Sequence, residues 1–152
     1  MQTCEAERDD EDVCGVLTQG LILVGRRWRT RLNERLKAIG QTDARCAALA
    51  EIARAPQGMP QRELSERLGV EEPTVVRLVD ALEAQGWVER RARADDRRVK
   101  VLVIKPSAMP VLRQAKEIVT GLEQEMFAEM SADDLASCVM ILRRLSGRLA
   151  RV

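Results

Sequence analysis

The sequence predicts a mainly α-helical fold with one small β-hairpin. Apolar residues recur at steps of three and four along most of the chain, which is the period of an amphipathic helix. Aromatic residues make up only 2% of the chain, so the core must come from aliphatic residues, alanine and methionine, most of which favour helices. The one run rich in β-branched residues is 99–104, and a chain of 152 residues is expected to form one compact domain.

The composition argues against an enzyme. Histidine is absent, which removes the commonest general base and the commonest metal ligand. No other catalytic constellation is visible in the sequence, and we expect no cofactor. There is no signal peptide and no apolar run approaching the ~20 residues that span a bilayer. We therefore expect a cytoplasmic protein with no membrane partner, whose cysteines, Cys4, Cys14, Cys46 and Cys138, are reduced.

The first third of the chain is expected to hold a tail and two helices. Residues 1–12 are strongly acidic and are predicted to form a flexible tail. Over 13–39 the apolar spacing predicts one long helix that Gly40 ends. Thr42 can then cap a second helix that stops before the next proline. Residues 13–55 are thus assigned as N-terminal helices.

Residues 56–105 are predicted to pass from two helices to a hairpin. A short helix begins at Pro60 and ends at the turn residue Gly69, and a second helix runs over 72–85. The hairpin strands are expected at 87–90 and 99–104, on either side of the charged loop 91–98. This order of elements is that of a winged helix-turn-helix, with the charged loop as the wing.

Residues 106–152 are predicted to form two further helices. Ser107 as N-cap would place Pro110 in the first turn, where a missing N–H costs little. Ser131 with Asp134 resembles a capping box at the start of the last helix. The apolar stripes of the two helices are Val111, Leu112, Ala115, Val119, Leu122 and Met126, and then Leu135, Cys138, Val139, Leu142, Leu145 and Leu149. On its stripe, Cys138 is expected to be a small core residue.

The second helix of the helix-turn-helix is predicted to have two unlike faces. Its inner face is formed by Val75, Leu78, Val79 and Leu82. Pro73, Thr74 and Arg77 fall on the outer face. A helix that enters a major groove ~12 Å wide needs short polar groups and an arginine there, because a guanidinium can bind guanine through two hydrogen bonds or clamp a phosphate. A merely solvated helix face is the alternative, and the hairpin that follows favours DNA.

The wing sequence is RRARADDRRVK over residues 90–100. Arg97 or Arg98 at its tip can enter a narrow minor groove, whose potential attracts guanidinium groups. A carboxylate facing DNA would repel phosphate, so we expect Asp95 or Asp96 to turn inward and hold an arginine. The candidate phosphate contacts are Arg62, Arg90, Arg91 and Arg93. The alternative is a charged, mobile hairpin loop.

The stretch GVEEPTVVRLVDALEAQGWVERR, the residues DDRR at 95–98 and the long flanking helices resemble the MarR/SlyA family of transcriptional regulators. The resemblance covers about Leu17 to Leu149. It implies that Pro73, Thr74 and Arg77 form the base-reading face, and that Asp96 and Arg97 are the wing pair with Arg98 beside them. The family's usual Leu-Thr after the second wing strand is Ile104-Lys105 here.

The resemblance also implies a homodimer held by the helices at both chain ends. Two recognition helices would then read a pseudo-palindromic operator in double-stranded DNA, and the family prior favours repression by blocking a promoter. Family members often bind small aromatic anions between the dimer helices and the winged domain. By position, such an effector would be bordered by Trp28, Leu32 and Cys46, with Arg27 or Arg31 as charge partner. The alternative is that this arginine-rich face meets solvent or the second subunit.

Two other functions remain open from the sequence. Some relatives sense peroxides through a cysteine near the start of the first helix, and Cys14 lies in that region. However, the accompanying tyrosines are missing, and the acidic neighbours Asp10, Glu11 and Asp12 disfavour a thiolate. The second alternative is a dimeric interaction protein that has lost DNA binding, which the acidic tail and the near-neutral net charge would allow.

Overall fold

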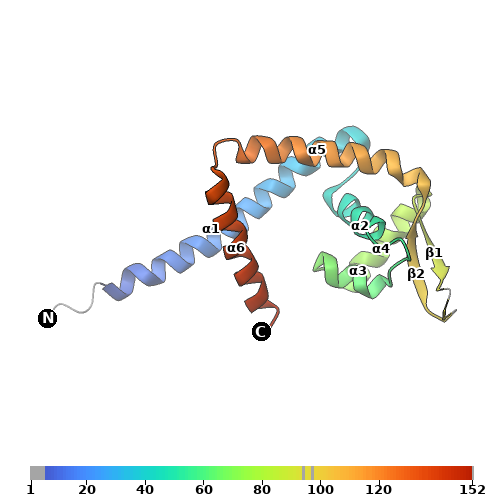
Figure 1. Cartoon of the computed structure of the whole chain (residues 1–152), viewed down its shortest axis with the longest axis horizontal. Helices are drawn as coiled ribbons and strands as arrows, with labels where there is room; N and C mark the ends of the chain where they lie inside the picture. Colours follow the sequence, from blue (N-terminus) through green and yellow to red (C-terminus); the bar gives the residue numbers. More distant parts are fainter. Residues whose placement is uncertain (1–5, 94, 97, 152) are drawn as a thin grey trace. The chain divides into compact units, whose positions relative to one another are not determined.

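The computed structural model describes residues 6–93, 95, 96 and 98–151 and confirms the predicted fold class (Figure 1). The elements are α1 (Ala6–Leu36), η1 (Lys37–Ile39), α2 (Asp43–Ala53), α3 (Gln61–Leu68), α4 (Glu72–Ala84), β1 (Val88–Ala92), β2 (Lys100–Ile104), η2 (Pro106–Ala108), α5 (Met109–Phe127) and α6 (Ala132–Leu149). The chain divides into two compact units, Met1–Ile118 and Val119–Val152. Among the residues described, no helix is both long and apolar enough to cross a bilayer.

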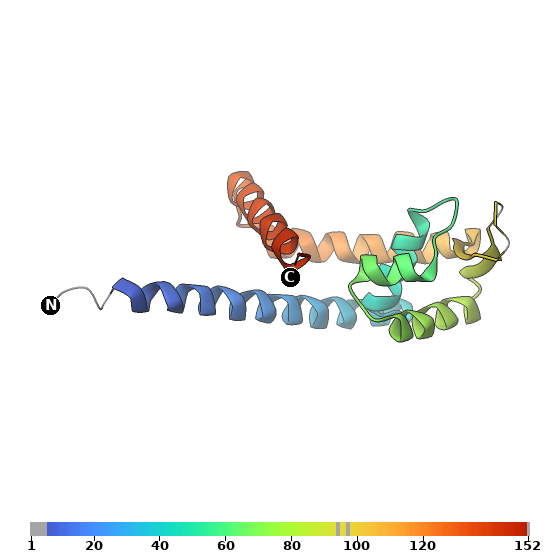
Figure 2. The same cartoon turned by 90° about the horizontal axis from the view of Figure 1, so that it is seen from below.

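The first helix, α1, begins at Ala6 and so takes up part of the segment expected as a tail. Acidic residues near a helix N-terminus interact favourably with the helix dipole, so the composition of this stretch is compatible with a helix. Figure 2 shows most of α1 extending away from α2, α3 and α4. The helix tightens into η1 and ends at Gly40, whose φ of 67° is one that glycine adopts without strain.

The ends of α2 and α3 follow the local sequence signals. The Thr42 hydroxyl accepts a hydrogen bond from the Arg45 backbone N–H at 3.4 Å, which makes Thr42 the predicted N-cap of α2. Pro60 stands at the N-cap of α3, and Gly69 ends this helix in the left-handed conformation. The turn after Gly69 leads directly into α4, so the two helices form the predicted helix-turn-helix.

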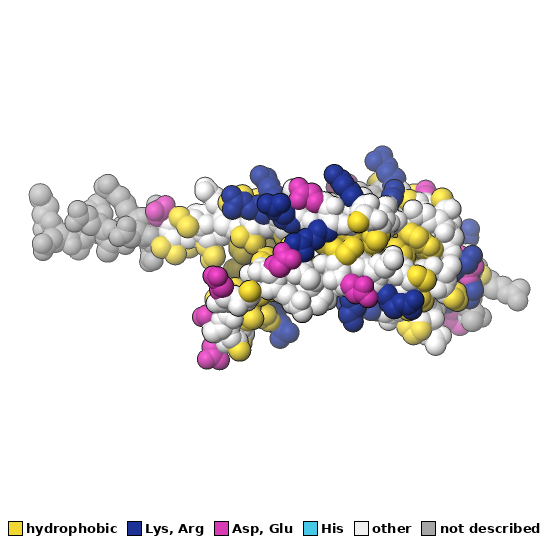
Figure 3. Space-filling model, turned by 90° about the horizontal axis from the view of Figure 1, so that it is seen from above, with side chains coloured by type: hydrophobic (Ala, Val, Ile, Leu, Met, Phe, Trp, Pro, Cys, Tyr) yellow, Lys and Arg dark blue, Asp and Glu magenta, His cyan; other side chains and the backbone are white. Residues whose placement is uncertain are grey.

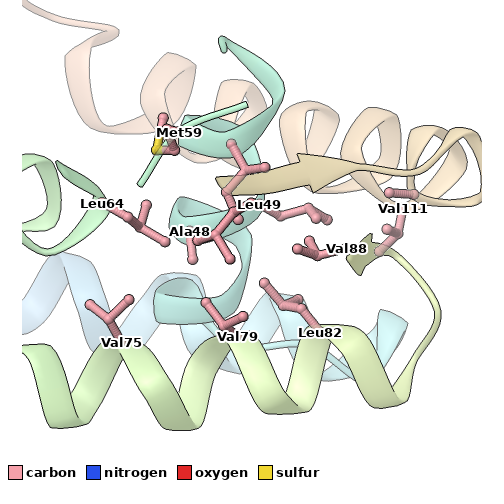
Figure 4. Packing of buried hydrophobic residues seen from close by; sticks show 12 residues of the cluster. Ala48, Leu49, Met59, Leu64, Val75, Val79, Leu82, Val88 and Val111 are labelled. Carbon is pink, nitrogen blue, oxygen red and sulfur yellow. The ribbon is translucent and has the colours of Figure 1, made fainter. Parts of the chain in front are cut away.

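The hydrophobic core of the unit Met1–Ile118 lies on one side of α4. Val75, Val79 and Leu82 are each 0% exposed and, as Figure 4 shows, point toward the buried residues of α2 and α3. The cluster also holds residues from the hairpin and from the start of α5, including Val88 and Val111. Three of the four residues assigned to the inner face are therefore fully buried, and the fourth, Leu78, is half-buried and packs against this cluster.

The hairpin is antiparallel, with Val88 opposite Ile104 and Ala92 opposite Lys100. The segment before α3 joins its edge through Met59, which exchanges two backbone hydrogen bonds with Leu102 at 3.1 and 2.7 Å. Gly58 makes this approach possible, because a Cβ at this position would lie 2.7 Å from a methyl carbon of Val101.

The start of α5 differs from the prediction. Ser107 is not an N-cap, since it lies inside η2 and its hydroxyl donates to the Gly86 carbonyl at 2.7 Å. Pro106 sets the φ angle of a tight turn in which the Ala108 N–H bonds to the Lys105 carbonyl, so the helical path begins earlier. Pro110 does lie in the first turn of α5, as expected.

In α6 the predicted cap is confirmed, while the stripe predicted to face inward is not covered. The Ser131 hydroxyl accepts from the Asp134 N–H at 3.1 Å and donates to the Asp134 carboxylate at 2.6 Å. Val139 and Leu142 are 47% and 49% exposed. Cys138, expected in a core, is exposed as well. Within the unit Val119–Val152, no described residue covers this face of α6.

A matched pair of substitutions tests the two-sided packing of α4. We expect Val79→Ala to lower the free energy of unfolding by about 2 kcal/mol, because it removes two buried methyl groups and leaves a cavity. Val76→Ala, in the same helix but on the exposed side, should change it by less than about 0.5 kcal/mol. Urea titration followed by circular dichroism at one protein concentration measures both values. Equal losses would contradict the assigned rotation of α4.

Candidate nucleic-acid interface

The outer face of α4 carries the three residues predicted to read bases. Pro73, Thr74 and Arg77 are all exposed, and Pro73 lies in the first turn of the helix. Within the part of the chain that the structure describes, the Arg77 guanidinium has no hydrogen-bond or ion-pair partner. Since a free guanidinium beside short side chains is what a groove contact requires, this face can meet a base edge without first breaking an internal bond.

Val76 on the same helix was not assigned a role from the sequence. It is 38% exposed, although its neighbour Val75 is fully buried. Helical spacing could have predicted this exposure, because Val76 follows Pro73 by one turn and therefore lies on the same side of the helix.

Arg90 on β1 ties the wing to α4. Its side chain forms ion pairs with Glu83 and with Asp80, the latter at 2.7 Å, and it lies 3.5 Å from the Gln61 side-chain oxygen. Its backbone N–H also donates to the Glu83 carboxylate at 3.0 Å. Arg90, a candidate phosphate contact, is thus engaged inside the fold and holds two parts of the interface together.

The tip of the wing is ordered by its two aspartates. Asp95 accepts a hydrogen bond from the Arg93 guanidinium at 2.5 Å, and this bond lowers the pKa of the Asp95 carboxyl. Asp96 is half-buried and accepts from the Arg98 backbone N–H at 3.0 Å, which closes the turn. The Arg98 side chain is exposed and has no partner among the described residues. Arg97, the predicted wing anchor, lies outside the described residues.

The other predicted phosphate contacts are already paired. Arg62 binds Glu66 at 3.1 Å, and Arg91 binds Glu89. The Arg62–Glu66 pair is exposed on both sides, and such pairs typically contribute about 0–1 kcal/mol, so a phosphate can replace the Glu66 carboxylate at little cost. Glu89 is half-buried, so the Arg91 pair is held more firmly. Among the described residues, the candidate interface therefore contains two kinds of arginine: Arg77 and Arg98, which have no partner, and paired ones on its periphery.

A pocket of about 510 Å³ lies behind the N-terminal turn of α4. Its walls are formed by Arg29, Asn33, Lys37, Gln41, Thr42, Asp43, Ala44, Ala47, Leu68, Val70, Thr74 and Leu78. Gln41 is only 5% exposed, and its side-chain oxygen has no hydrogen-bond partner within the described part of the chain. A buried amide oxygen of this kind needs a donor, which a bound molecule or water can supply.

The residues predicted to border an effector do not line this pocket. Leu32 is buried, Trp28 is half-buried, and Arg31 pairs with Glu34 at 3.3 Å. Cys46 lies beside Trp87 at a narrow gap between α2 and α5. Burial, and then the charge on Asp43, raise the pKa of the Cys46 thiol to about 11.

The helix-turn-helix, the exposed face of its second helix and the hairpin define a winged helix-turn-helix regulator of transcription. The sequence model of the MarR family matches residues 39–99 of the chain. The crystal structure of transcriptional regulator PA3341 is similar, with 34% identity, a TM-score of 0.82 and coverage of 90% of this chain and 99% of that chain. This protein belongs to the MarR family.

Two further solved structures are similar to the chain. A mutant of Escherichia coli MarR complexed with operator DNA is 26% identical, with a TM-score of 0.76 and coverage of 85% of this chain and 92% of that one. CouR from Rhodococcus jostii bound to p-coumaroyl-CoA is 24% identical, with a TM-score of 0.78 and coverage of 89% and 92%. The similarity to CouR is a similarity of fold.

The raised pKa of Cys46 predicts slow alkylation at ordinary pH. In a variant whose only cysteine is Cys46, the rate with iodoacetamide should rise about tenfold per pH unit up to about pH 11, because only the thiolate reacts. The same chain in urea should level off above about pH 8.5. Mass spectrometry over a pH series measures both. A folded-state plateau near pH 8.5 would contradict the burial of this thiol and would favour a redox role for it.

Proposed function

We propose that the protein is a homodimeric, sequence-specific DNA-binding regulator that represses transcription by occupying a promoter. The observation that carries this proposal is the two-sidedness of α4: Val75, Val79 and Leu82 on its inner face are fully buried. On the outer face stand Pro73, Thr74 and Arg77, and Arg77 has no partner among the described residues. The E. coli relative, 26% identical and complexed with operator DNA, supports the same use of the fold.

Exposed apolar residues at both chain ends support the homodimer. On α1 they are Val13, Val16, Leu17, Leu21, Ile22, Leu23 and Val24, and on α6 they are Val139, Met140, Ile141, Leu142 and Leu149. Figure 3 shows hydrophobic side chains at the surface of the part of α1 that follows the residues drawn in grey. Apolar surface of this extent on a soluble chain marks an interface. A two-fold dimer would place its recognition helices roughly 34 Å apart, in successive major grooves of a pseudo-palindrome.

Within this proposal the contacts divide into three kinds. Pro73, Thr74 and Arg77 read base edges in the major groove. Arg97 and Arg98 enter the minor groove from a wing tip that Asp96 shapes through its bond to the Arg98 N–H. Phosphates are held by Arg62, Arg91 and Arg93, each of which exchanges its carboxylate partner for a phosphate oxygen.

A small aromatic or anionic effector would bind in the 510 Å³ pocket, whose volume is that of a small-molecule site. Leu68, Val70 and Leu78 supply apolar walls and Lys37 supplies positive charge, while Arg29 is paired with Asp43 at 3.6 Å in the same wall. Thr74 belongs both to this pocket and to the outer face of α4, so a molecule held there would contact a residue that DNA also needs. We therefore assign the effector to this pocket in place of the set Trp28, Leu32, Cys46 and Arg31.

Substituting Arg77 should separate base reading from phosphate binding. On a duplex selected from a random library by the wild-type protein, Arg77→Ala should weaken binding by about 1–3 kcal/mol while binding to random duplex changes less. Arg62→Ala, the matched removal of one arginine, should weaken binding to both duplexes alike. Mobility shifts give the affinities, and sedimentation velocity confirms that each variant stays dimeric. Equal losses on both duplexes for Arg77→Ala would reject its base-reading role, and the absence of any selected duplex would favour a dimeric interaction protein.

The wing assignment predicts a change in salt dependence. Arg97→Ala and Arg98→Ala should each weaken binding and reduce the slope of log affinity against log salt concentration by about one, because a guanidinium in the minor groove displaces condensed cations as a phosphate contact does. Arg113→Ala on α5 removes the same charge outside the winged helix-turn-helix and should leave the slope unchanged. Affinities at several salt concentrations decide the matter. If both wing variants keep the wild-type slope, the wing does not contact DNA.

A further inference from the structure

We propose that Val76 reads the 5-methyl group of a thymine in each half-site, next to the base pair that Arg77 contacts. This inference rests on the proposed DNA-binding function and names a specificity residue that the sequence alone did not single out.

The geometry places Val76 on the groove side of α4. Val75 and Val79 are fully buried, while Val76 between them is 38% exposed. At about 100° per residue, Val76 shares its side of the helix with Pro73, one turn earlier, and Asp80, one turn later. Arg77 lies about 100° further around the same outer surface. A helix that presents Arg77 and Pro73 to a groove therefore brings Val76 to the groove as well.

Among the described residues, the packing that fixes α4 does not require a valine at this position. Its side chain is not in the buried cluster that fixes α4. A β-branched residue in an exposed helix position is also less favourable than alanine, since it loses side-chain freedom there. A single exposed valine is ordinary elsewhere on a protein surface, but this one stands in the middle of the recognition face.

The charges around Val76 direct it to a base and away from a phosphate. Glu72 precedes it by one turn and Asp80 follows by one turn, so its flank of the helix is acidic. Asp80 is held at 2.7 Å by Arg90, which keeps that carboxylate on the wing side. Neither Glu72 nor Asp80 offers a cation to a phosphate, so only a base edge is left as a partner for Val76. In the major groove the apolar group available to a valine is the thymine methyl.

Uracil substitution tests the contact, because it removes the thymine methyl and keeps every base-pairing group. In the duplex selected by the wild-type protein, each thymine of the half-site is replaced in turn by deoxyuridine. Wild-type binding should fall about fourfold at one position, within about two base pairs of the one that Arg77→Ala affects. This value corresponds to about 0.8 kcal/mol for one buried methyl group, with 1.4 kcal/mol for each factor of ten. Replacement in both half-sites should cost about fifteenfold.

Val76→Ala should bind the thymine and uracil duplexes equally well at that position. Met130→Ala is the matched control, because Met130 is also 38% exposed but lies between α5 and α6, outside the winged helix-turn-helix, and it should keep the full preference for thymine. Thermal unfolding followed by circular dichroism verifies that both variants fold as the wild type does.

The outcomes separate the two proposals. If a thymine methyl matters equally in the wild type and in Val76→Ala, another residue reads it and the inference is wrong. If no thymine methyl matters although a duplex is selected, the inference fails while the DNA-binding function stands. If no duplex is selected at all, the proposed function fails and takes this inference with it.

Discussion

The rotation of α4 about its own axis is the constraint on which the interface depends. Burial of Val75, Val79 and Leu82 against α2 and α3 allows one setting of the helix. A rotation that turned Arg77 inward would expose a valine and bury an unpaired guanidinium, at a cost of several kcal/mol. The polar face is therefore positioned by apolar packing that lies on the other side of the same helix.

The wing depends on α4 in turn. Arg90 joins Asp80 and Glu83 on the helix, and the Trp87 N–H bonds to the carbonyl of Leu82, so the first strand starts from a fixed point. At the other end of the hairpin, Asp96 closes the turn through the Arg98 N–H. Arg90 and Asp96 thus help to position α4 and the wing, the two elements proposed to reach DNA.

Local signals made most of the fold predictable from the sequence. The caps at Thr42 and Ser131 and the turn at Gly69 depend on neighbouring residues, and so they appear in the sequence as short patterns. Ser107 was assigned wrongly because its partner is the Gly86 carbonyl, 21 residues away along the chain. The partners of Arg90 on α4 and α3 were likewise invisible to periodicity.

The polar residues of the candidate interface could be predicted from the sequence, whereas the exposed Val76 could not. Arg77 stood out because a charged residue interrupts an apolar pattern, whereas Val76 resembled its buried neighbours Val75 and Val79 in type. The apolar stripe of α6 also shows what residue spacing leaves open. Spacing indicates that Val139 and Leu142 share a face, but it does not tell whether the same chain or a second copy covers that face.

The charge distribution shows how a nearly neutral chain can offer a site to a polyanion. With 25 basic and 24 acidic residues, the net charge is +1, so attraction over the whole surface contributes little. What distinguishes the proposed interface is which arginines lack partners.

Arg62 and Arg93 are held by nearby carboxylates, while Arg77 and Arg98 are free within the described chain. Free guanidinium groups interact with DNA without first breaking an internal bond, and the paired ones exchange a carboxylate for a phosphate at little net gain. Under the proposed function, such an arrangement would give weak binding to any DNA and reserve most of the affinity for the sequence that fits the outer face of α4.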